Sequence, residues 1–122
     1  MKVMIKIIMT IMVIATMTVQ AAPKPDDSDA LKGVVKGKVI FDINMVSAKK
    51  MTLYLMVIDE TVDDLVRQGV EPDVVLAFRG KSVNMITKNR DNVELTDFEY
   101  LDKISAQINV LQKKAYVFKP VP

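Results

Sequence analysis

The stretch Gly80-Lys81-Ser82 has the residue types that bind phosphate in a P-loop, where a lysine and a hydroxyl follow a glycine-rich turn. A P-loop also needs a second glycine five positions earlier, so that a wide loop of backbone N–H groups can surround the phosphates. Val75 occupies that position, inside an apolar run that is typical of a strand. The match is therefore limited to three letters, and the sequence does not predict a nucleotide-binding loop.

A site for a smaller ligand is compatible with the same stretch. In open parallel sheets, ligands bind beyond the carboxyl ends of the strands, and the free N–H groups of helix N-termini attract anions. One hypothesis is therefore capture of a small anion or carboxylate at the two strand ends. The alternative is structural: Gly80 serves a tight turn, Ser82 caps the next helix and Arg79 pairs with an acidic residue. The candidate ligand-binding residues are Asn44, Ser47, Arg79, Gly80, Lys81 and Ser82.

The sequence contains no cysteine and no histidine. Disulfides, thiolate or imidazole metal sites, cysteine catalysis and a Ser-His-acid triad are therefore excluded. We predict no catalytic residues, no metal site and no cofactor. The acidic residues between positions 59 and 64 would suit only a hard cation, and a solvated helix face is the simpler interpretation. The four methionines after residue 21 would suit copper, but three lie on apolar helix faces, which favours a core role.

Residues 1–21 have the layout of a secretory signal peptide. Lys2 and Lys6 precede an uncharged run of 13 residues that ends at Val19, and small or permitted side chains follow up to Ala21. An uncleaved membrane anchor is the alternative, but a spanning helix needs about 20 apolar residues. We therefore predict cleavage after Ala21 and a periplasmic or secreted protein that keeps no stable membrane span.

The chain after the predicted cleavage point is electrically neutral. Lys2 and Lys6 account for two of the 17 basic residues, so 15 basic residues remain against 15 acidic ones. A neutral domain lacks the electrostatic footprint that nucleic acid requires, and we predict no nucleic-acid partner. Residues 22–37 are rich in Pro, Asp, Ser and Gly and lack periodicity, which predicts a flexible linker.

The remaining chain alternates between strand-like and helix-like patterns. This alternation predicts the α/β class, with a small parallel sheet in a three-layer α/β/α arrangement. The first two strands are largely apolar runs, as is typical of strands buried on both faces. Asp42 interrupts the first one and is expected to face an edge or a partner subunit, or alternatively to be a buried functional acid. The expected elements are strands at Lys38–Asn44, Val74–Phe78 and Ala115–Lys119, and helices at Ser47–Gln68, Ser82–Thr87 and Thr96–Lys114.

The first long helix carries the clearest pattern. Its apolar residues recur at spacings of three and four, and its first half is apolar nearly all round, which predicts burial by more than one layer. Ser47 is expected to cap its N-terminus, and Gly69 to take the left-handed position after its last turn. In the second long helix, Thr96 and Glu99 have the spacing of a capping box.

The succession of motifs resembles the DsrE/DsrF-like family, in particular its exported, uncharacterised members. The residues that carry the resemblance are "KVIFDIN", the helix ending in "RQGVEPD", and "VVLAFRGKSVNMI", and it covers about residues 38–114 of a domain expected at 38–119. The resemblance implies an α/β/α sandwich with a parallel sheet, usually oligomeric. Some cytoplasmic members relay sulfur as a cysteine persulfide, which a chain without cysteine cannot do.

The sequence thus leads to one preferred function and two alternatives. We expect a non-enzymatic interaction or assembly module, because the chain is neutral, lacks Cys and His, and has a small sheet with open edges. Its expected partners are further copies of itself or a related DsrE-like subunit. The alternatives are a protein that binds a small anion or carboxylate at the strand ends, and an inactive, shortened fragment of the sulfur-relay family.

Overall fold

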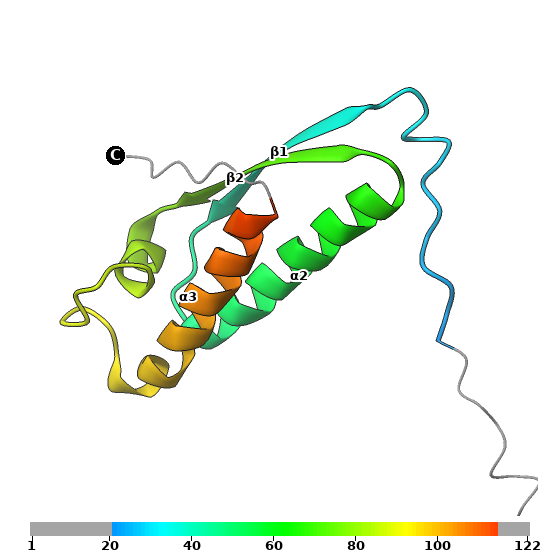
Figure 1. Cartoon of the computed structure of the whole chain (residues 1–122). Helices are drawn as coiled ribbons and strands as arrows, with labels where there is room; N and C mark the ends of the chain where they lie inside the picture. The colour runs from blue at the N-terminus through cyan, green and yellow to red at the C-terminus, as the bar shows by residue number, and fades with distance from the viewer. Residues whose placement is uncertain (1–20, 115–122) are drawn as a thin grey trace, which may run out of the picture.

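The computed structural model describes residues 21–114 of the chain (Figure 1). The predicted third strand at 115–119 and nearly all of the predicted signal peptide lie outside these residues. The order strand-helix-strand-helix-helix is confirmed. The predicted short helix is a 3-10 helix, and a second short 3-10 helix precedes the last helix. The elements are β1 (Lys36–Ile43), α2 (Ala48–Arg67), β2 (Glu71–Phe78), η1 (Gly80–Met85), η2 (Leu95–Asp97) and α3 (Phe98–Lys113).

The two strands form a parallel sheet, as predicted. Pairing runs without interruption from Lys36 opposite Glu71 to Ile43 opposite Phe78. β1 begins two residues earlier than expected, so the last two residues of the predicted linker belong to the sheet. Because side chains alternate between the two faces of a strand, one face of each strand turns toward the helices and the other turns away.

The prediction that both strands are buried on both faces is wrong for the described part of the chain. On β1, Ile43 is fully buried but Ile40, on the opposite face, is 72% exposed. The reason is the layering: both helices lie on the same side of the sheet (Figure 1). A second helical layer, which the three-layer prediction requires, is not seen within residues 21–114. A continuous apolar run does not reveal which of its faces is covered.

Helix α2 has the boundaries that its sequence predicts. The Oγ of Ser47 accepts a hydrogen bond from the backbone N–H of Lys50 at 3.5 Å, and Gly69 follows the last turn with a φ of 80°. These contacts satisfy backbone groups that a helix end otherwise leaves free. The predicted stripe is buried against the sheet and α3, and its fully or almost fully buried members are Ala48, Met51, Leu55, Ile58 and Val62.

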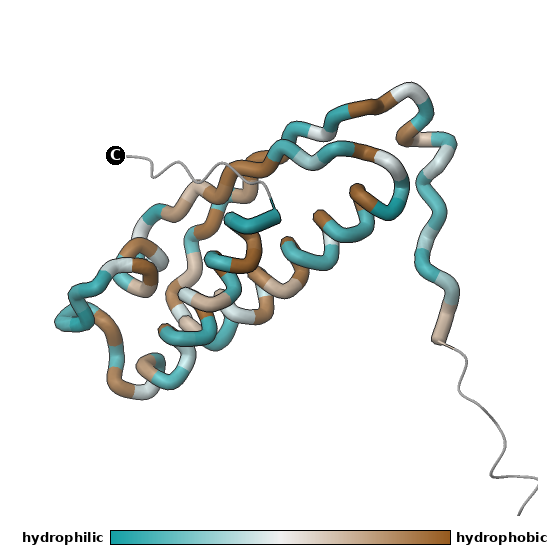
Figure 2. The backbone as a smooth tube through the Cα atoms, in the orientation of Figure 1, coloured by the Kyte–Doolittle hydropathy of each residue, from teal (hydrophilic) through white to brown (hydrophobic). Residues whose placement is uncertain are grey.

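Helix α3 runs parallel to α2 and packs along it. The side-chain amide of Gln107 donates to the backbone carbonyl of Thr52 at 2.9 Å, and Lys114 contacts Asp59 at 2.7 Å, so residue numbers rise together along both helices. Figure 2 shows apolar and polar bands alternating along both.

The expected capping box at the start of α3 is wrong. Thr96 lies inside the 3-10 turn η2, and Asp97 occupies the N-cap position without a side-chain hydrogen bond to the helix. Asp97 already has near-helical backbone angles, φ −92° and ψ −11°, whereas a capping residue is extended so that its side chain can reach the free N–H groups. The 3-10 turn therefore replaces the capping box that the Thr96–Glu99 spacing suggests.

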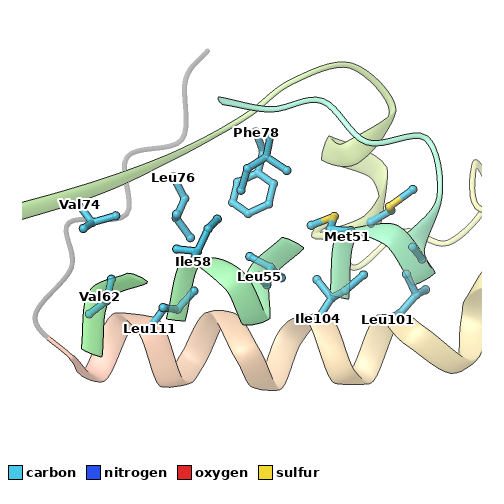
Figure 3. Close-up of a cluster of buried hydrophobic side chains, with 13 residues drawn as sticks. Met51, Leu55, Ile58, Val62, Val74, Leu76, Phe78, Leu101, Ile104 and Leu111 are labelled. Carbon is cyan, nitrogen blue, oxygen red and sulfur yellow. The ribbon is translucent and has the colours of Figure 1, made fainter. Parts of the chain in front are cut away.

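The core lies between the sheet and the two helices. In Figure 3, Val74, Leu76 and Phe78 point from β2 toward α2, and the labelled side chains of α3 point into the same cluster. Burial of such side chains stabilises the fold by about 1.5–3 kcal/mol each. The members from α3 are Leu101, Ile104 and Leu111.

The segment before β1 contacts the C-terminal half of α2. The ammonium of Lys24 lies 2.9 Å from Asp64 and 3.4 Å from Glu60. The backbone N–H of Asp27 donates to the side chain of Gln68 at 2.8 Å. These contacts place part of the predicted linker beside the acidic end of α2.

Candidate functional site

Arg79 is the strongest candidate cation at the strand ends, and it is held by an acidic residue. Its Nε donates to one carboxylate oxygen of Asp42 at 2.7 Å, and its Nη2 donates to the other at 2.8 Å. Both side chains project from the outer face of the sheet, since their positions alternate with the buried Ile43 and Phe78. This is the structural alternative that the sequence left open, and it gives Asp42 its partner.

The pair changes the protonation of both groups. The hydrogen bonds from Arg79 hold the pKa of Asp42 below its ordinary value, and the same bonds raise the pKa of Arg79. Asp42 therefore stays ionised and occupies both arms of the guanidinium. An incoming anion would have to displace a carboxylate that already makes the bidentate contact preferred by arginine.

Ser82 is buried, and its hydroxyl hydrogen-bonds to the backbone. Its hydroxyl lies 2.6 Å from the carbonyl oxygen of Ile43 and 2.6 Å from that of Arg79. A hydroxyl has one proton, so it donates to one of these carbonyls at a time. Ser82 does not cap the following helix: Arg79 is at that position, and no side-chain capping bond is seen there. The side chain instead joins the ends of β1 and β2.

Gly80 is present because the backbone and a neighbouring side chain require it. Its φ of 62° lies in the left-handed region, which costs other residues about 1–2 kcal/mol. A Cβ at this position would also collide with the side-chain oxygen of Asn44. Asn44 and Gly80 are therefore brought together by a turn that packs them tightly.

The two remaining candidates are separated. Ser47 is the N-cap of α2. Lys81 lines a crevice of about 70 Å³, and Glu94 and Asp97 line it too. No other residue of the predicted set lines this crevice, and its two carboxylates oppose the binding of an anion. The six candidates thus gather at the correct end of the sheet without forming one pocket.

The larger hollows lie along the helices. One, of about 430 Å³, lies between α3 and the loop after β2, and the ion pair of Arg90 with Asp102, 3.1 Å long, lies at its wall. A second, of about 490 Å³, runs between α2 and α3. The second is the more apolar in its side chains, with Leu53 and Met56 of α2 facing Ala106 of α3.

The second groove belongs to a wider apolar surface. Leu53 is 55% exposed, and Met56 and Val57 are each 58% exposed; we refer to these three residues as the α2 apolar face. Positions three and four apart lie on one side of a helix, so the three form one continuous surface. On α3, Val110 is 46% exposed and lines a neighbouring hollow together with Met56.

The sequence contained a signal for this surface. The first half of α2 is apolar nearly all round, which predicts a second covering layer. Within residues 21–114 that layer is not found, because the sheet and α3 cover only the opposite side. The polar residues at the strand ends give no indication of this surface, because its residues are apolar.

Among residues 21–114, no group of three or more acidic side chains is arranged to hold a metal ion. In the same part, no helix is both long and apolar enough to cross a membrane. Comparison with known proteins gave no match to a family model, to a curated protein or to a solved structure.

Proposed function

We propose that this protein is a non-enzymatic interaction module that assembles through the α2 apolar face. The observation that carries the proposal is the contrast between the two sides of one helix. The stripe facing the sheet and α3 is buried, while Leu53, Met56 and Val57 on the other side are more than half exposed. A fold that needed only its own core would place polar residues there.

Burial of this face by a partner is energetically favourable. Transfer of apolar surface out of water contributes about 25 cal/mol per Å². Three adjacent apolar side chains and the groove beside them offer a surface that a partner can cover without separating existing contacts. The groove of about 490 Å³ supplies the concave part, and the projecting methionine supplies an adaptable contact.

The chemistry of the chain supports a binding role over a catalytic one. Nucleophilic catalysis with an imidazole base has no candidate residue, since the sequence has no Cys and no His. At the strand ends, Arg79 is paired with Asp42, and Ser82 donates to backbone carbonyls. Arg79 and Ser82, two of the candidates for ligand binding, therefore have structural roles.

The proposal includes export and a relationship to DsrE-like proteins. Export rests on the basic start, the uncharged run and the cleavage pattern of residues 1–21. The relationship rests on the motifs quoted above and on the parallel strand–helix–strand order. The partner is then a second copy of the chain or a related subunit of this class.

Export and assembly are tested on the same material. The full chain is expressed in a bacterium with a general secretion pathway, and intact-mass spectrometry of the purified protein gives its N-terminus. Export predicts a chain that begins at Ala22; a chain that retains Met1 contradicts it.

The mass in solution is then measured by size-exclusion chromatography with light scattering. The proposal predicts a homogeneous oligomer. A stable, folded monomer at about 100 µM, a concentration at which typical specific interfaces are occupied, contradicts it. Heterogeneous aggregate contradicts it too, and favours the alternative of an inactive fragment.

A further inference from the structure

Charges on α2 are ordered along the same side of the helix as the α2 apolar face. Steps of three and four place the basic residues, the apolar residues and the acidic residues one after another on this side. The basic end precedes the apolar centre, and the acidic end follows it. The order along the helix is Lys49, Lys50, then Leu53, Met56 and Val57, then Glu60 and Asp64.

We propose that two copies of this chain pair through this side of α2, with the two helices antiparallel around a two-fold axis between Met56 and Val57. This inference rests on the proposed function and specifies its partner. A two-fold axis makes the surface self-complementary. The basic end of each copy then faces the acidic end of the other, and the apolar centres meet.

The positions match in detail. Around that axis, Met56 of one copy lies opposite Val57 of the second copy, and Lys49 lies opposite Asp64 of the second copy. Leu53 lies opposite Glu60 of the second copy, where the aliphatic part of the glutamate can cover the leucine. A parallel arrangement would place Lys49 against Lys49, and like charges across an interface are unfavourable.

The basic and acidic ends of this side of α2 still carry opposite net charges when the ion pairs within one copy are counted. Neither Lys49 nor Lys50 makes an ion pair to another residue of the 21–114 part, and Lys103 of α3 lines the groove beside them. At the other end, the four carboxylates between positions 59 and 64 meet three cations. These cations are Lys24, Arg67 and Lys114, with contacts of 2.7–3.4 Å.

The basic end is therefore unneutralised, and the acidic end keeps an excess of one carboxylate. Lys114 contacts both Asp59 and Asp63 at 2.7 Å, so its single charge is shared by two carboxylates, whereas Glu60 and Asp64 meet two cations, Lys24 and Arg67. A lysine from a second copy would complete the neutralisation of this end. The arrangement also gives Lys49 and Lys50 the acidic partners that they lack within one copy.

The test uses two charge-reversed forms of the full chain. The acidic form carries Lys49→Glu and Lys50→Glu; the basic form carries Glu60→Lys and Asp64→Lys. Each form has like charges at both ends, so it should repel itself while attracting the other form. The substitutions add acids near the N-terminus of α2 and bases nearer its C-terminus, which the helix dipole favours. Circular dichroism checks that each form is folded.

Dissociation constants are measured by sedimentation velocity, and native mass spectrometry identifies the species in the mixture. We expect each form alone to dissociate at least about tenfold more readily than the wild type, since close charge pairs couple by about 1.5 kcal/mol or more. The equimolar mixture is expected to recover wild-type affinity as a heterodimer. Restored pairing only in the mixture supports the antiparallel arrangement.

Two other results overturn the inference in different ways. If both forms associate as tightly as the wild type, or if their mixture gives no heterodimer, the antiparallel pairing is wrong while assembly itself stands. If the wild type is a folded monomer, both the pairing and the proposed function are wrong. Loss of association in 1 M salt is a second readout. At this salt concentration the Debye length is about 3 Å, so the charge pairs at the two ends are screened.

Discussion

Arg79 and Asp42 form a two-bonded ion pair on the outer face of the sheet, with nitrogen–oxygen distances of 2.7 and 2.8 Å. The pair links the end of β2 to β1. It also neutralises Arg79, the cation that the sequence indicates as a candidate for binding an anion. The same geometry that makes arginine a good anion site here serves an anion supplied by the chain itself.

The ion pair predicts a specific dependence of stability on pH. The pKa of Asp42 is lowered from 3.8 by the hydrogen bonds from Arg79. A lowered folded-state pKa means that the contribution is complete above the unfolded value and is lost as the pH falls through the folded one. We expect the difference in free energy of unfolding between wild type and Asp42→Asn to shrink as the pH falls below 3.8.

Urea unfolding from pH 7 to pH 2 measures this difference. Asp64 also has a lowered pKa, but it is present in both proteins, so its effect cancels in the comparison. A difference that stays constant over the whole range would show that the pair does not titrate with the carboxylate of Asp42.

Freeing Arg79 should create the weak anion site that the wild type lacks. We expect no heat on titration of the wild type with sulfate or phosphate at millimolar concentration. In Asp42→Asn the guanidinium loses its charged partner, and weak sulfate binding is expected. The control is Asp42→Asn combined with Arg79→Gln, which should again be silent. Binding by the wild type that is lost in Arg79→Gln would instead support the anion-binding alternative.

Ser82 is expected to matter for stability because its hydroxyl satisfies buried carbonyls. Ser82 is fully buried, and its donor lies 2.6 Å from the last carbonyl of β1. Removal of a buried hydrogen-bond partner costs about 1–3 kcal/mol, so Ser82→Ala should lower the free energy of unfolding by that amount. Ser105→Ala is the matched control at an exposed position of α3 and should change it by less than about 0.5 kcal/mol. Equal effects in both variants would contradict the role given to Ser82.

Two constraints act at Gly80, its left-handed backbone and the side chain of Asn44, and substitutions can separate their effects on stability. Gly80→Ala meets both a left-handed backbone and the side chain of Asn44, whereas Gly69→Ala meets only a left-handed backbone, with a φ of 80° and open space around the Cβ. We expect Gly69→Ala to destabilise by about 1–2 kcal/mol and Gly80→Ala to destabilise by more.

A double-mutant cycle isolates the collision. In the background of Asn44→Ala, Gly80→Ala should cost about as much as Gly69→Ala does, because only the backbone term remains. An effect of Gly80→Ala that does not depend on Asn44 would show that the side chain moves aside without cost.

Local signals in the sequence predicted local structure well. Ser47 and Gly69 mark the ends of α2 because caps depend on residues within one turn. The parallel sheet follows from the alternation of strand and helix. The capping box at Thr96 failed because a neighbouring 3-10 turn took those residues, which the four-residue pattern does not encode.

The site depends on contacts between residues that are far apart in the sequence, and local sequence patterns do not predict such contacts. Ser82 contacts the carbonyl of Ile43, 39 residues away, and Arg79 contacts Asp42, 37 residues away. The sequence allows Arg79 to pair with an acidic residue, but the register of β1 against β2 determines which acid it is. Which side of α2 stays exposed likewise depends on where α3 packs.

Burial of the α2 apolar face in an assembly is tested most directly by one comparison of molar masses. Val57→Glu and Ile40→Glu each place a charge on an exposed apolar residue, 58% and 72% exposed, on α2 and on the outer face of the sheet. Light scattering on the wild type and both variants is expected to show an oligomer that Val57→Glu dissociates and Ile40→Glu leaves intact. An oligomer that survives Val57→Glu but dissociates in Ile40→Glu would contradict the account and place the interface on the sheet.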